Sequence, residues 1–502
     1  MSSNDHRDVL AAIARRAMIE RGLEPDWTPA ARAELARLGS GRIEGLRDLR
    51  ALPWSSIDND ESRDLDQLEV CVEEERRDPR LLIAIADVDS LVKKGSALDD
   101  HARTNTTSVY TPVLVFPMLP EELSTDRTSL NADVDRAAIV IDMRIDAEGV
   151  VSATDVYGAV VRNHAKLTYE SVAAWLDGHA AAPAAIAAWS ELEAQLRLQD
   201  RLASDLRARR HAEGALEFER SEIKPVVADG EVRELRTVEP NRARDIIESF
   251  MIAANGTTAQ FLSSRGSPSI RRVVRSPERW SRIVDLAAAH GAHLPDAPDA
   301  RSLQAFLKDQ RGSEDFADLS LSVIKLLGRG EYVAEDATGP ASTHFALAAS
   351  NYTHSTAPNR RFPDLITQRL IKAALNRSGP PYSVSELTGL AEHCTRQEDA
   401  ANKVERHVRK AAAALWLSGR ISEEFDAIVT GASPKGTWVR LPRPPIEGRL
   451  ERGYEGLDVG DRVRVRLIHT DPERGYIDFA RVAERDGKWK MENGNKKIGR
   501  RG

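Results

Sequence analysis

The spacing of apolar residues along the chain changes several times. Up to residue 50 it is helical, with a break near Pro25 and Pro29, and this stretch is too short for more than a small helical cap. From about 55 to 160, β-branched and apolar runs alternate with turn residues, most clearly at 81–87 and 137–145. These runs predict strands.

Helical spacing then returns in four long segments. They cover residues 165–212, 244–262, 361–376 and 385–418. The fold class is therefore α+β, with one large domain over 51–418 that follows a short helical region over 1–50.

A different pattern begins after residue 418. Short β-like runs occur at 425–430, 438–441, 462–469 and 475–480, with Gly and Pro residues between them. Four or five short strands in one segment predict a small β-barrel of the OB type over 419–483. Such barrels commonly bind single-stranded nucleic acid. The basic tail, 484–502, is expected to be disordered and solvated.

Composition places the chain among soluble globular proteins. It has 502 residues, of which 41% are apolar and 30% charged, which excludes a disordered chain. The net charge of -7 gives no sign of a nucleic-acid partner, so any RNA-binding surface must be local. Cys71 and Cys394 are expected to be reduced. No signal sequence and no membrane-length apolar run is found, so we expect a cytoplasmic protein without a membrane partner.

The segment 57–67 carries the candidate chemistry. It holds five carboxylates just before the apolar run 81–87. Like charges held this close repel one another, and a bound divalent cation relieves the repulsion. Oxygen ligands suit a hard ion such as Mg²⁺, with Mn²⁺ as a substitute. A run of acids is, however, more often a solvated turn than a metal site.

A calcium-binding EF-hand loop is a second interpretation of this segment. Acidic and Ser residues from Asp58 to Glu69 fall at the ligand positions of such a loop. Arg63 stands where the loop needs Gly, and Pro53 would interrupt the entering helix. A calcium-buffering protein is therefore rejected.

Several phrases in the rest of the chain support a metal site. In order, they lie at 83–89, 107–112, 116–124, 129–131, 247–255, 344–347 and 352–364. Together with 58–67 they make the sequence resemble the ribonuclease II (RNB-domain) exoribonucleases over roughly residues 50–480. The resemblance implies removal of nucleotides one at a time from the 3′ end of single-stranded RNA, with release of nucleoside 5′-monophosphates. It implies Mg²⁺ as cofactor and no organic cofactor; protein partners are unknown.

The same resemblance assigns roles to individual residues. Asp58, Asp64, Asp66 and Gln67 would hold the metal ion. Asp64, Asp66 and Arg360 would be catalytic, because a guanidinium suits phosphate contact and transition-state charge. The structural alternative for Arg360 is a salt bridge, for example with Asp364.

Five further residues match family positions along the RNA. Tyr110 and Phe218 would stack on bases, Tyr169 and Glu248 would lie near the terminal ribose, and Glu405 near the RNA path. Core packing is the alternative for the aromatic residues, and a solvated helix face is the alternative for Glu405.

Two departures from the family pattern change the expectations. Gln67 stands where the family usually has a fourth Asp, so we expect weaker or altered metal binding. The first 50 residues cannot hold the two cold-shock-type barrels of well-known members. An RNA-binding regulator with impaired catalysis is therefore the alternative function.

Overall fold

The structure is a computed structural model. It describes residues 6–39, 41, 43–218, 222–228, 230–238, 240–313, 316–336, 339, 342–434 and 436–482. The chain forms two compact units. The larger consists of residues 11–222 and 238–406, and the smaller of 1–10, 223–237 and 407–502. The predicted tail over 484–502 lies outside the described residues, and the domain boundaries drawn from the sequence remain predictions.

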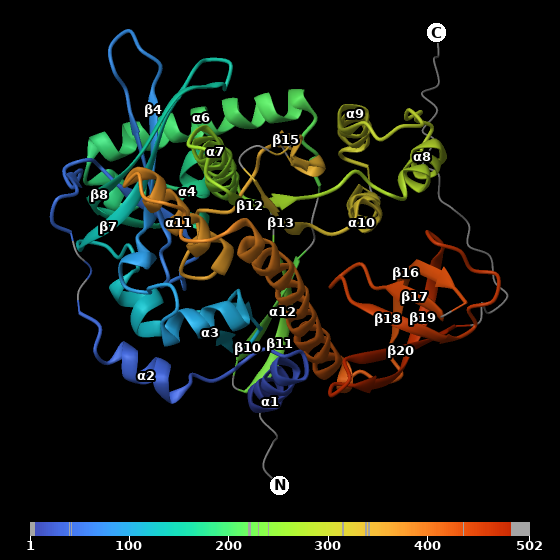
Figure 1. Ribbon diagram of the computed structural model, residues 1–502. Helices are drawn as coiled ribbons and strands as arrows, with labels where there is room; N and C mark the ends of the chain where they lie inside the picture. The colour runs from blue at the N-terminus through green and yellow to red at the C-terminus, as the bar shows by residue number, and fades with distance from the viewer. Residues whose placement is uncertain are drawn as a thin grey trace, which may run out of the picture. The chain divides into compact units, whose positions relative to one another are not determined.

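A seven-stranded sheet forms the centre of the larger unit (Figure 1). Its strands are antiparallel except for two parallel pairs, β1 with β8 and β2 with β9. In spatial order they are β1 (Arg47–Asp48), β8 (Val151–Arg162), β7 (Asp135–Ile145), β4 (Arg80–Ala86), β3 (Gln67–Val72), β2 (Ser55–Asp58) and β9 (Ala165–Thr168).

Both faces of this sheet are covered, which explains why β4 reads as a continuous apolar run. Leu81, Ile83 and Ile85 face a core shared with the helices α6 and α7. Leu82 and Ala84 face the opposite core, which α11 and α12 help to form. The helices of the first face are α4 (Tyr169–Leu176), α5 (Ala184–Ala187), α6 (Ser190–Glu213) and α7 (Arg242–Ser264).

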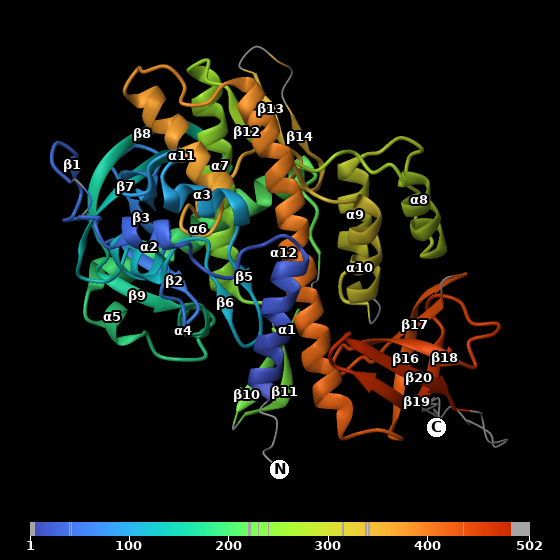
Figure 2. The same ribbon diagram turned by 60° about the horizontal axis from the view of Figure 1, so that its bottom comes forward.

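The second core gathers elements from distant parts of the chain (Figure 2). They are α2 (Pro29–Leu35), α3 (Ala97–Asn105), α11 (Phe362–Leu375) and the first half of α12 (Val384–Ser418). The helices α7, α11 and α12 and the strands β4 and β7 were all predicted from the sequence within a few residues, as was the α+β class.

A separate helical cluster in the larger unit was not predicted. The helices α8 (Trp280–Ala289), α9 (Ala300–Gln310) and α10 (Phe316–Leu327) pack around their own apolar core. The remaining elements are α1 (His6–Glu20), β5 (Val109–Tyr110), β6 (Val115–Phe116), β10 (Glu222–Ala228), β11 (Glu231–Val238), β12 (Ser269–Val273), β13 (Glu331–Glu335), β14 (Thr343–His344) and β15 (Ala349–Ser350), with the short helical turns Val88–Ser90, Glu122–Arg127 and Phe345–Leu347.

The smaller unit contains the predicted barrel. Five strands close it in the order β16 (Glu424–Ser433), β17 (Gly436–Arg440), β18 (Glu447–Arg452), β20 (Tyr476–Arg481) and β19 (Arg462–Asp471). β18 had escaped the sequence pattern because its only large apolar residue is Leu450. Gly448 is required there, since a Cβ atom would lie 2.4 Å from the ring of Phe479.

Two sequence expectations concern the whole chain. Cys71 and Cys394 are buried free thiols, as expected. Among the helices of the described residues, none is long and apolar enough to cross a membrane.

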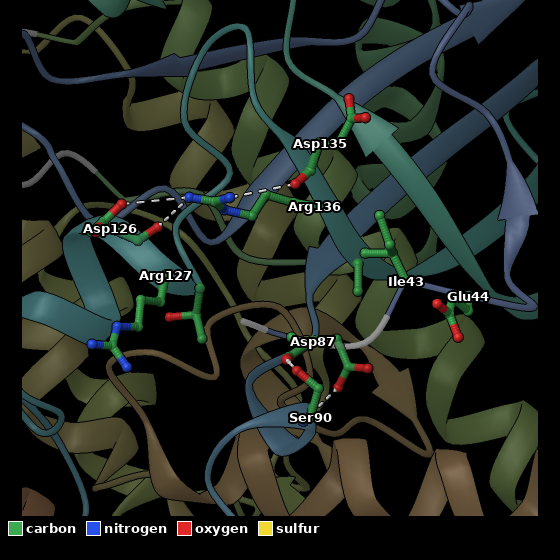
Figure 3. Close-up of a pocket in the computed structure, with 11 residues that line it drawn as sticks. Ile43, Glu44, Asp87, Ser90, Asp126, Arg127, Asp135 and Arg136 are labelled. Carbon is green, nitrogen blue, oxygen red and sulfur yellow. Dashed lines mark hydrogen bonds and ion pairs between the residues drawn. The ribbon is translucent and has the colours of Figure 1, made fainter. Parts of the chain in front are cut away.

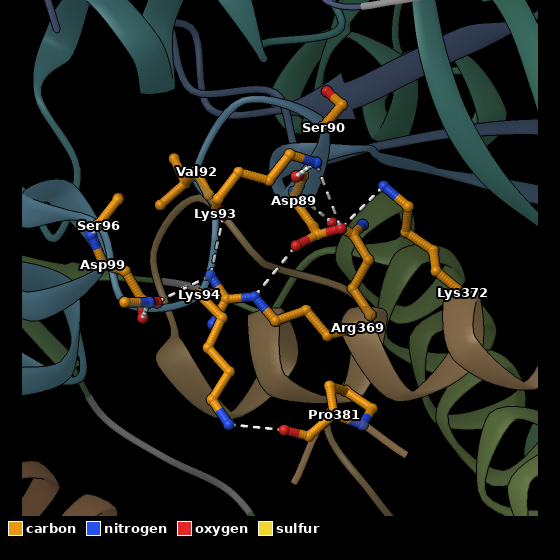
Figure 4. Close-up of polar contacts among 12 residues, drawn as sticks. Asp89, Ser90, Val92, Lys93, Lys94, Ser96, Asp99, Arg369, Lys372 and Pro381 are labelled. Atoms are coloured by element: carbon orange, nitrogen blue, oxygen red, sulfur yellow. Dashed lines mark hydrogen bonds and ion pairs between the residues drawn. The ribbon is translucent and has the colours of Figure 1, made fainter. Parts of the chain in front are cut away.

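A buried network of charges joins α11 to the turn that follows β4 (Figure 4). Arg369, which is 3% exposed, lies 3.1 Å from Asp89 and 2.8 Å from Asp99, and its Nη1 donates to the hydroxyl of Tyr382 at 2.7 Å. Lys372 adds ion pairs to Asp89 and Asp87. Because buried charges need this compensation, the network fixes the second half of α11 against the turn that follows β4.

We predict that Arg369→Met lowers the free energy of unfolding by about 3–5 kcal/mol, because two buried carboxylates lose a shared partner. Arg396→Met is the matched control. Arg396 is 65% exposed and lies 3.9 Å from Glu392, so its loss should cost less than about 1 kcal/mol. Urea unfolding of both variants measures the difference. Equal losses would show that the network does not stabilise the fold.

Candidate active site

Most of the predicted site residues line one cavity of about 260 Å³ in the larger unit. Asp58, Asp64, Asp66 and Gln67 come from one edge of the sheet. The rest of the wall comes from distant segments of the chain. The lining also contains Asn59, Ser62, Tyr110, Tyr169, Arg244, Ile247, Met251, Thr356 and Arg360.

The acidic residues are held together by a loop between two paired strands. β2 ends at Asp58 and β3 begins at Gln67, so residues 59–66 form the connection at the edge of the sheet. Ser129 fixes the loop: its Oγ accepts the N–H of Leu65 at 3.0 Å and donates to the carbonyl of Arg63 at 2.8 Å. Strands rather than helices flank the loop, so it is not an EF-hand.

Asp66 is the most deeply buried carboxylate of the site. It is 1% exposed, and its Oδ1 accepts the backbone N–H of Asn359 at 2.9 Å. Its Oδ2 lies 3.3 Å from Nε of Arg360. Burial raises the pKa of Asp66 to about 7, and neighbouring Asp64 adds to the rise while Arg360 opposes it.

The two other aspartates have different surroundings. Oδ1 of Asp58 accepts the N–H of Asn59 at 2.7 Å and the hydroxyl of Ser62 at 2.8 Å. Oδ2 of Asp64 accepts the hydroxyl of Tyr110 at 3.3 Å. Burial raises the pKa of Asp64 as well.

The donor chemistry of this edge fits a hard divalent cation. Carboxylate oxygens and the amide oxygen of Gln67 are suitable ligands. Within the described residues, Oδ2 of Asp66 is buried and accepts no hydrogen bond, which leaves it available to a metal ion. As the side chains lie, however, no group of three or more His, Cys, Asp or Glu residues in the described ranges is arranged to hold an ion. The ligands fit a metal ion in kind but do not form a closed set.

Tyr110 lies at the open side of the cavity on β5. It is 41% exposed, and its backbone N–H donates to Oε1 of Glu405 at 2.9 Å. Glu405 comes from α12, so this helix positions the tyrosine beside Asp64. The pair therefore brings two of the predicted RNA-binding residues to one place.

Arg244 was missed by the sequence analysis. It lies in the first turn of α7, and its guanidinium is 4.4 Å from the ring centre of Tyr169. Its Nη2 donates to Oδ1 of Asn59 at 2.8 Å. Helical spacing could have identified it, because Arg244, Ile247 and Met251 follow the i, i+3, i+7 pattern and all three line the cavity.

Three of the predicted RNA-binding residues do not line the cavity: Glu248, Phe218, and Glu405, which contacts it through Tyr110. Glu248 is exposed on α7, next to the lining residue Ile247. Phe218 is half-buried and packs against the core of α8–α10, as the packing alternative expected. Their contacts with RNA remain predictions.

The larger unit has a second cavity, of about 580 Å³ (Figure 3). Asp87, Thr128 and Arg136 line it together with residues near Ile43, and none of the predicted site residues is among its lining. Thr128 connects the two places, since its hydroxyl bonds to Oδ1 of Asn359 at 2.6 Å and Asn359 holds Asp66. Asn359 is 1% exposed, so this link between Thr128 and Asp66 runs through the protein interior.

Comparison with protein families identifies the family to which the chain belongs. Residues 46–377 match the RNB domain. This chain belongs to the RNB-domain family. Residues 423–482 match the RNase II-type exonuclease C-terminal S1 domain, and they span the five-stranded barrel. The resemblance drawn from the sequence phrases is thereby confirmed.

Curated relatives of this RNB protein are named Ribonuclease R. Those of Vibrio parahaemolyticus and Escherichia coli K12 are each 29% identical to it over 91% of this chain. The chain spans about six-tenths of their length, 59% and 60% respectively.

Solved structures show the same fold. Mycoplasma genitalium RNase R in complex with ribose methylated single-stranded RNA matches with a TM-score of 0.85 at 20% identity, over 95% of this chain and 78% of that one. Yeast Ssd1, described as a pseudonuclease, matches with a TM-score of 0.69 at 17% identity, over 93% of this chain and 57% of that one. At these identities the likeness concerns the fold alone.

We predict that the contribution of Asp66 to the stability of the metal-free protein falls as the pH rises from about 4 to 7. The Asp66 carboxyl has a pKa near 3.9 in the unfolded chain and about 7 in the folded one. In this window the unfolded state binds fewer protons, so stability falls by up to about 1.4 kcal/mol per pH unit. Above pH 7 the contribution is constant.

The test is urea unfolding with a chelator at pH 5 and pH 8, for wild type and Asp66→Asn. The neutral amide does not titrate, so the variant should gain stability relative to wild type at pH 8. The same difference between the two proteins at both pH values would contradict the raised pKa.

Proposed function

We propose that this protein is a metal-dependent 3′→5′ exoribonuclease that degrades single-stranded RNA to nucleoside 5′-monophosphates. The observation that carries the proposal is the meeting of Asp58, Asp64, Asp66 and Arg360 in one cavity of an RNB-family chain. The names of the curated relatives support the same activity.

The cavity suits the end of a single strand. Its volume of about 260 Å³ is below the roughly 300–1,000 Å³ of common small-molecule pockets, which favours one nucleotide over a duplex. Tyr110, exposed at the open side, offers its ring to a base, since stacking tolerates any sequence. Tyr169 lies on the wall formed by α4 and α7 and would face the terminal nucleoside.

The reaction consumes one water for each nucleotide removed. The water oxygen bonds to the phosphorus of the last phosphodiester, and the bond from phosphorus to the 3′ oxygen of the preceding nucleotide breaks. That 3′ oxygen takes up a proton, and the last nucleotide departs as its 5′-monophosphate. Arg360 would hold the phosphate and stabilise the charge that develops on it.

Asp58, Asp64, Asp66 and Gln67 would hold Mg²⁺. When bound, the ion would lower the pKa of a water and neutralise phosphate charge. The chain's own part is to orient the carboxylates: Asn359 and Arg360 fix Asp66, and Tyr110 fixes Asp64. The buried Asp66 must lose its proton before it binds a metal ion, so we expect the affinity for Mg²⁺ to rise with pH up to about 7.

An RNA-binding regulator with impaired catalysis is the second candidate. Gln67 favours it, because the neutral amide is a weaker ligand than carboxylate. The fold also occurs in a protein described as a pseudonuclease. Against it, the three aspartates and Arg360 line one cavity, an arrangement that a binding protein does not need.

A 5′-labelled single-stranded oligoribonucleotide with Mg²⁺ or Mn²⁺ separates the two candidates. We expect a ladder that shortens from the 3′ end, with matched DNA left intact. Asp66→Asn should slow cleavage about a hundredfold or more while RNA binding persists, because it removes charge at the reacting phosphate and leaves the RNA-contacting surface unchanged.

Arg396→Met, on the exposed face of α12, serves as the control and should cleave at the wild-type rate. Binding without shortening in both metals would favour the regulator. Full cleavage by Asp66→Asn would show that the centre lies elsewhere.

A further inference from the structure

The charged groups of the cavity are nearly balanced. Its lining carries the carboxylates of Asp58, Asp64 and Asp66 and the guanidinium groups of Arg244 and Arg360. Gln67, beside Asp66, is neutral. Two divalent cations require several carboxylates to offset and bridge them. Three carboxylates against two guanidinium groups leave one net negative charge, which falls far short of the charge of two such cations.

The two guanidinium groups lie at different carboxylates. Arg360 is next to Asp66, with Nε 3.3 Å from Oδ2. Arg244 reaches the other side through Asn59, whose backbone N–H bonds to Asp58. Arg360 therefore lies at the end of the acidic loop that carries Asp66, and Arg244 lies at the end next to Asp58. The position of Arg244 was not expected from the sequence.

Among the described residues, the one acid paired with Arg244 is exposed rather than buried. Asn59 is a neutral partner, and the ring of Tyr169 offers only its π-face. Glu170 lies 3.4 Å away, but it is 65% exposed and screened by solvent. The guanidinium therefore keeps positive charge available to an anion in the cavity.

The carboxylate oxygens of Asp58 and Asp66 differ in the number of hydrogen bonds that they accept. Oδ1 of Asp58, on the Arg244 side, already accepts two hydrogen bonds, from Asn59 and Ser62. Oδ2 of Asp66 is buried and accepts none within the described residues. Within the described residues, Oδ2 of Asp66 has the ion pair with Arg360 but no hydrogen bond, so it keeps more capacity for a metal ion, and Asp64 and Gln67 line the same cavity.

We propose that the cavity holds a single divalent cation at Asp64, Asp66 and Gln67, and that Arg244 supplies on the Asp58 side the positive charge of a second cation. Arg244 is then a catalytic residue that contacts a non-bridging oxygen of the scissile phosphate. A guanidinium suits this role because it is planar, always charged and matched to phosphate geometry. The inference rests on the proposed nuclease function.

Calorimetric titration of the chelator-treated full chain with Mn²⁺ tests the number of ions. We expect one site per chain. In Arg244→Gln we expect Mn²⁺ to bind about threefold or more tightly, because a nearby positive charge is gone. The rate constant kcat for RNA shortening should at the same time fall about tenfold or more. A merely structural role would not move the two quantities in opposite directions.

Two variants complete the design. Arg242→Gln is the control: Arg242 lies on the same helix, pairs with Asp200 and Asp177, and is absent from the cavity lining, so neither quantity should change more than about twofold. Arg244→Lys keeps the charge but not the planar fork, so Mn²⁺ affinity should stay near wild type while kcat falls. Its folding is checked by thermal unfolding, and it serves where Arg244→Gln does not fold.

Gln67→Asp combined with Arg244→Gln should create a second Mn²⁺ site. Two sites in wild type, weaker Mn²⁺ binding in Arg244→Gln, or an unchanged kcat would overturn the inference. If wild type shortens RNA and binds two ions, only this inference fails. If wild type binds no Mn²⁺ and leaves RNA intact, the proposed function fails with it.

Discussion

The architecture around the cavity depends on one buried carboxylate, that of Asp66. A carboxylate removed from water needs hydrogen bonds or an opposite charge. Asn359 and Arg360 supply both, from a segment almost three hundred residues away in the sequence. That segment leads directly into α11, which Arg369 and Lys372 fix to the sheet through buried ion pairs. These contacts thus fix the position of the sheet edge, which carries Asp66, relative to α11 and the segment before it, which carries Arg360.

The compensation of Asp66 is incomplete, which is why its pKa rises to about 7. Oδ2 accepts no hydrogen bond in the described part of the chain, and the like charge of Asp64 is close by. Such strain is typical of functional sites, where a ligand removes it. A cation at Asp66 would add a second partner to Oδ2, which has the ion pair with Arg360 but no hydrogen bond, and would offset both carboxylates. Binding of a cation at Asp66 should therefore also stabilise the folded chain.

Much of the fold was accessible from the sequence because its signals are local. β4 has apolar residues on both faces, α7 has helical spacing, and the barrel strands alternate apolar and polar residues. Each of these patterns can be recognised within about ten to twenty residues of sequence. β18 did not, because a strand with one large apolar residue is recognised only by its partners. The helices α8–α10 form their own core and carry no motif that drew attention to them.

The site was predictable only in part, for the same reason. The acidic loop and the 352–364 phrase are contiguous and could be read directly. The helical spacing of Arg244 places it on one face with cavity residues, but the spacing gives it no role, since its importance comes from Tyr169, seventy-five positions earlier, and from Asn59. Phe218 illustrates the reverse: a short local match, placed by tertiary packing against α8–α10. Contacts that depend on distant partners are those that sequence patterns miss.

The most direct test of the account is a crystal structure of the protein with Mn²⁺ and a short RNA whose last phosphodiester resists hydrolysis. We expect anomalous density for Mn²⁺ about 2.0–2.2 Å from Oδ2 of Asp66. The last phosphate of the RNA should lie between that ion and Arg360, with the 3′ end inside the cavity. Mn²⁺ bound away from Asp66, or an RNA 3′ end outside this cavity, would contradict the assignment of the catalytic centre.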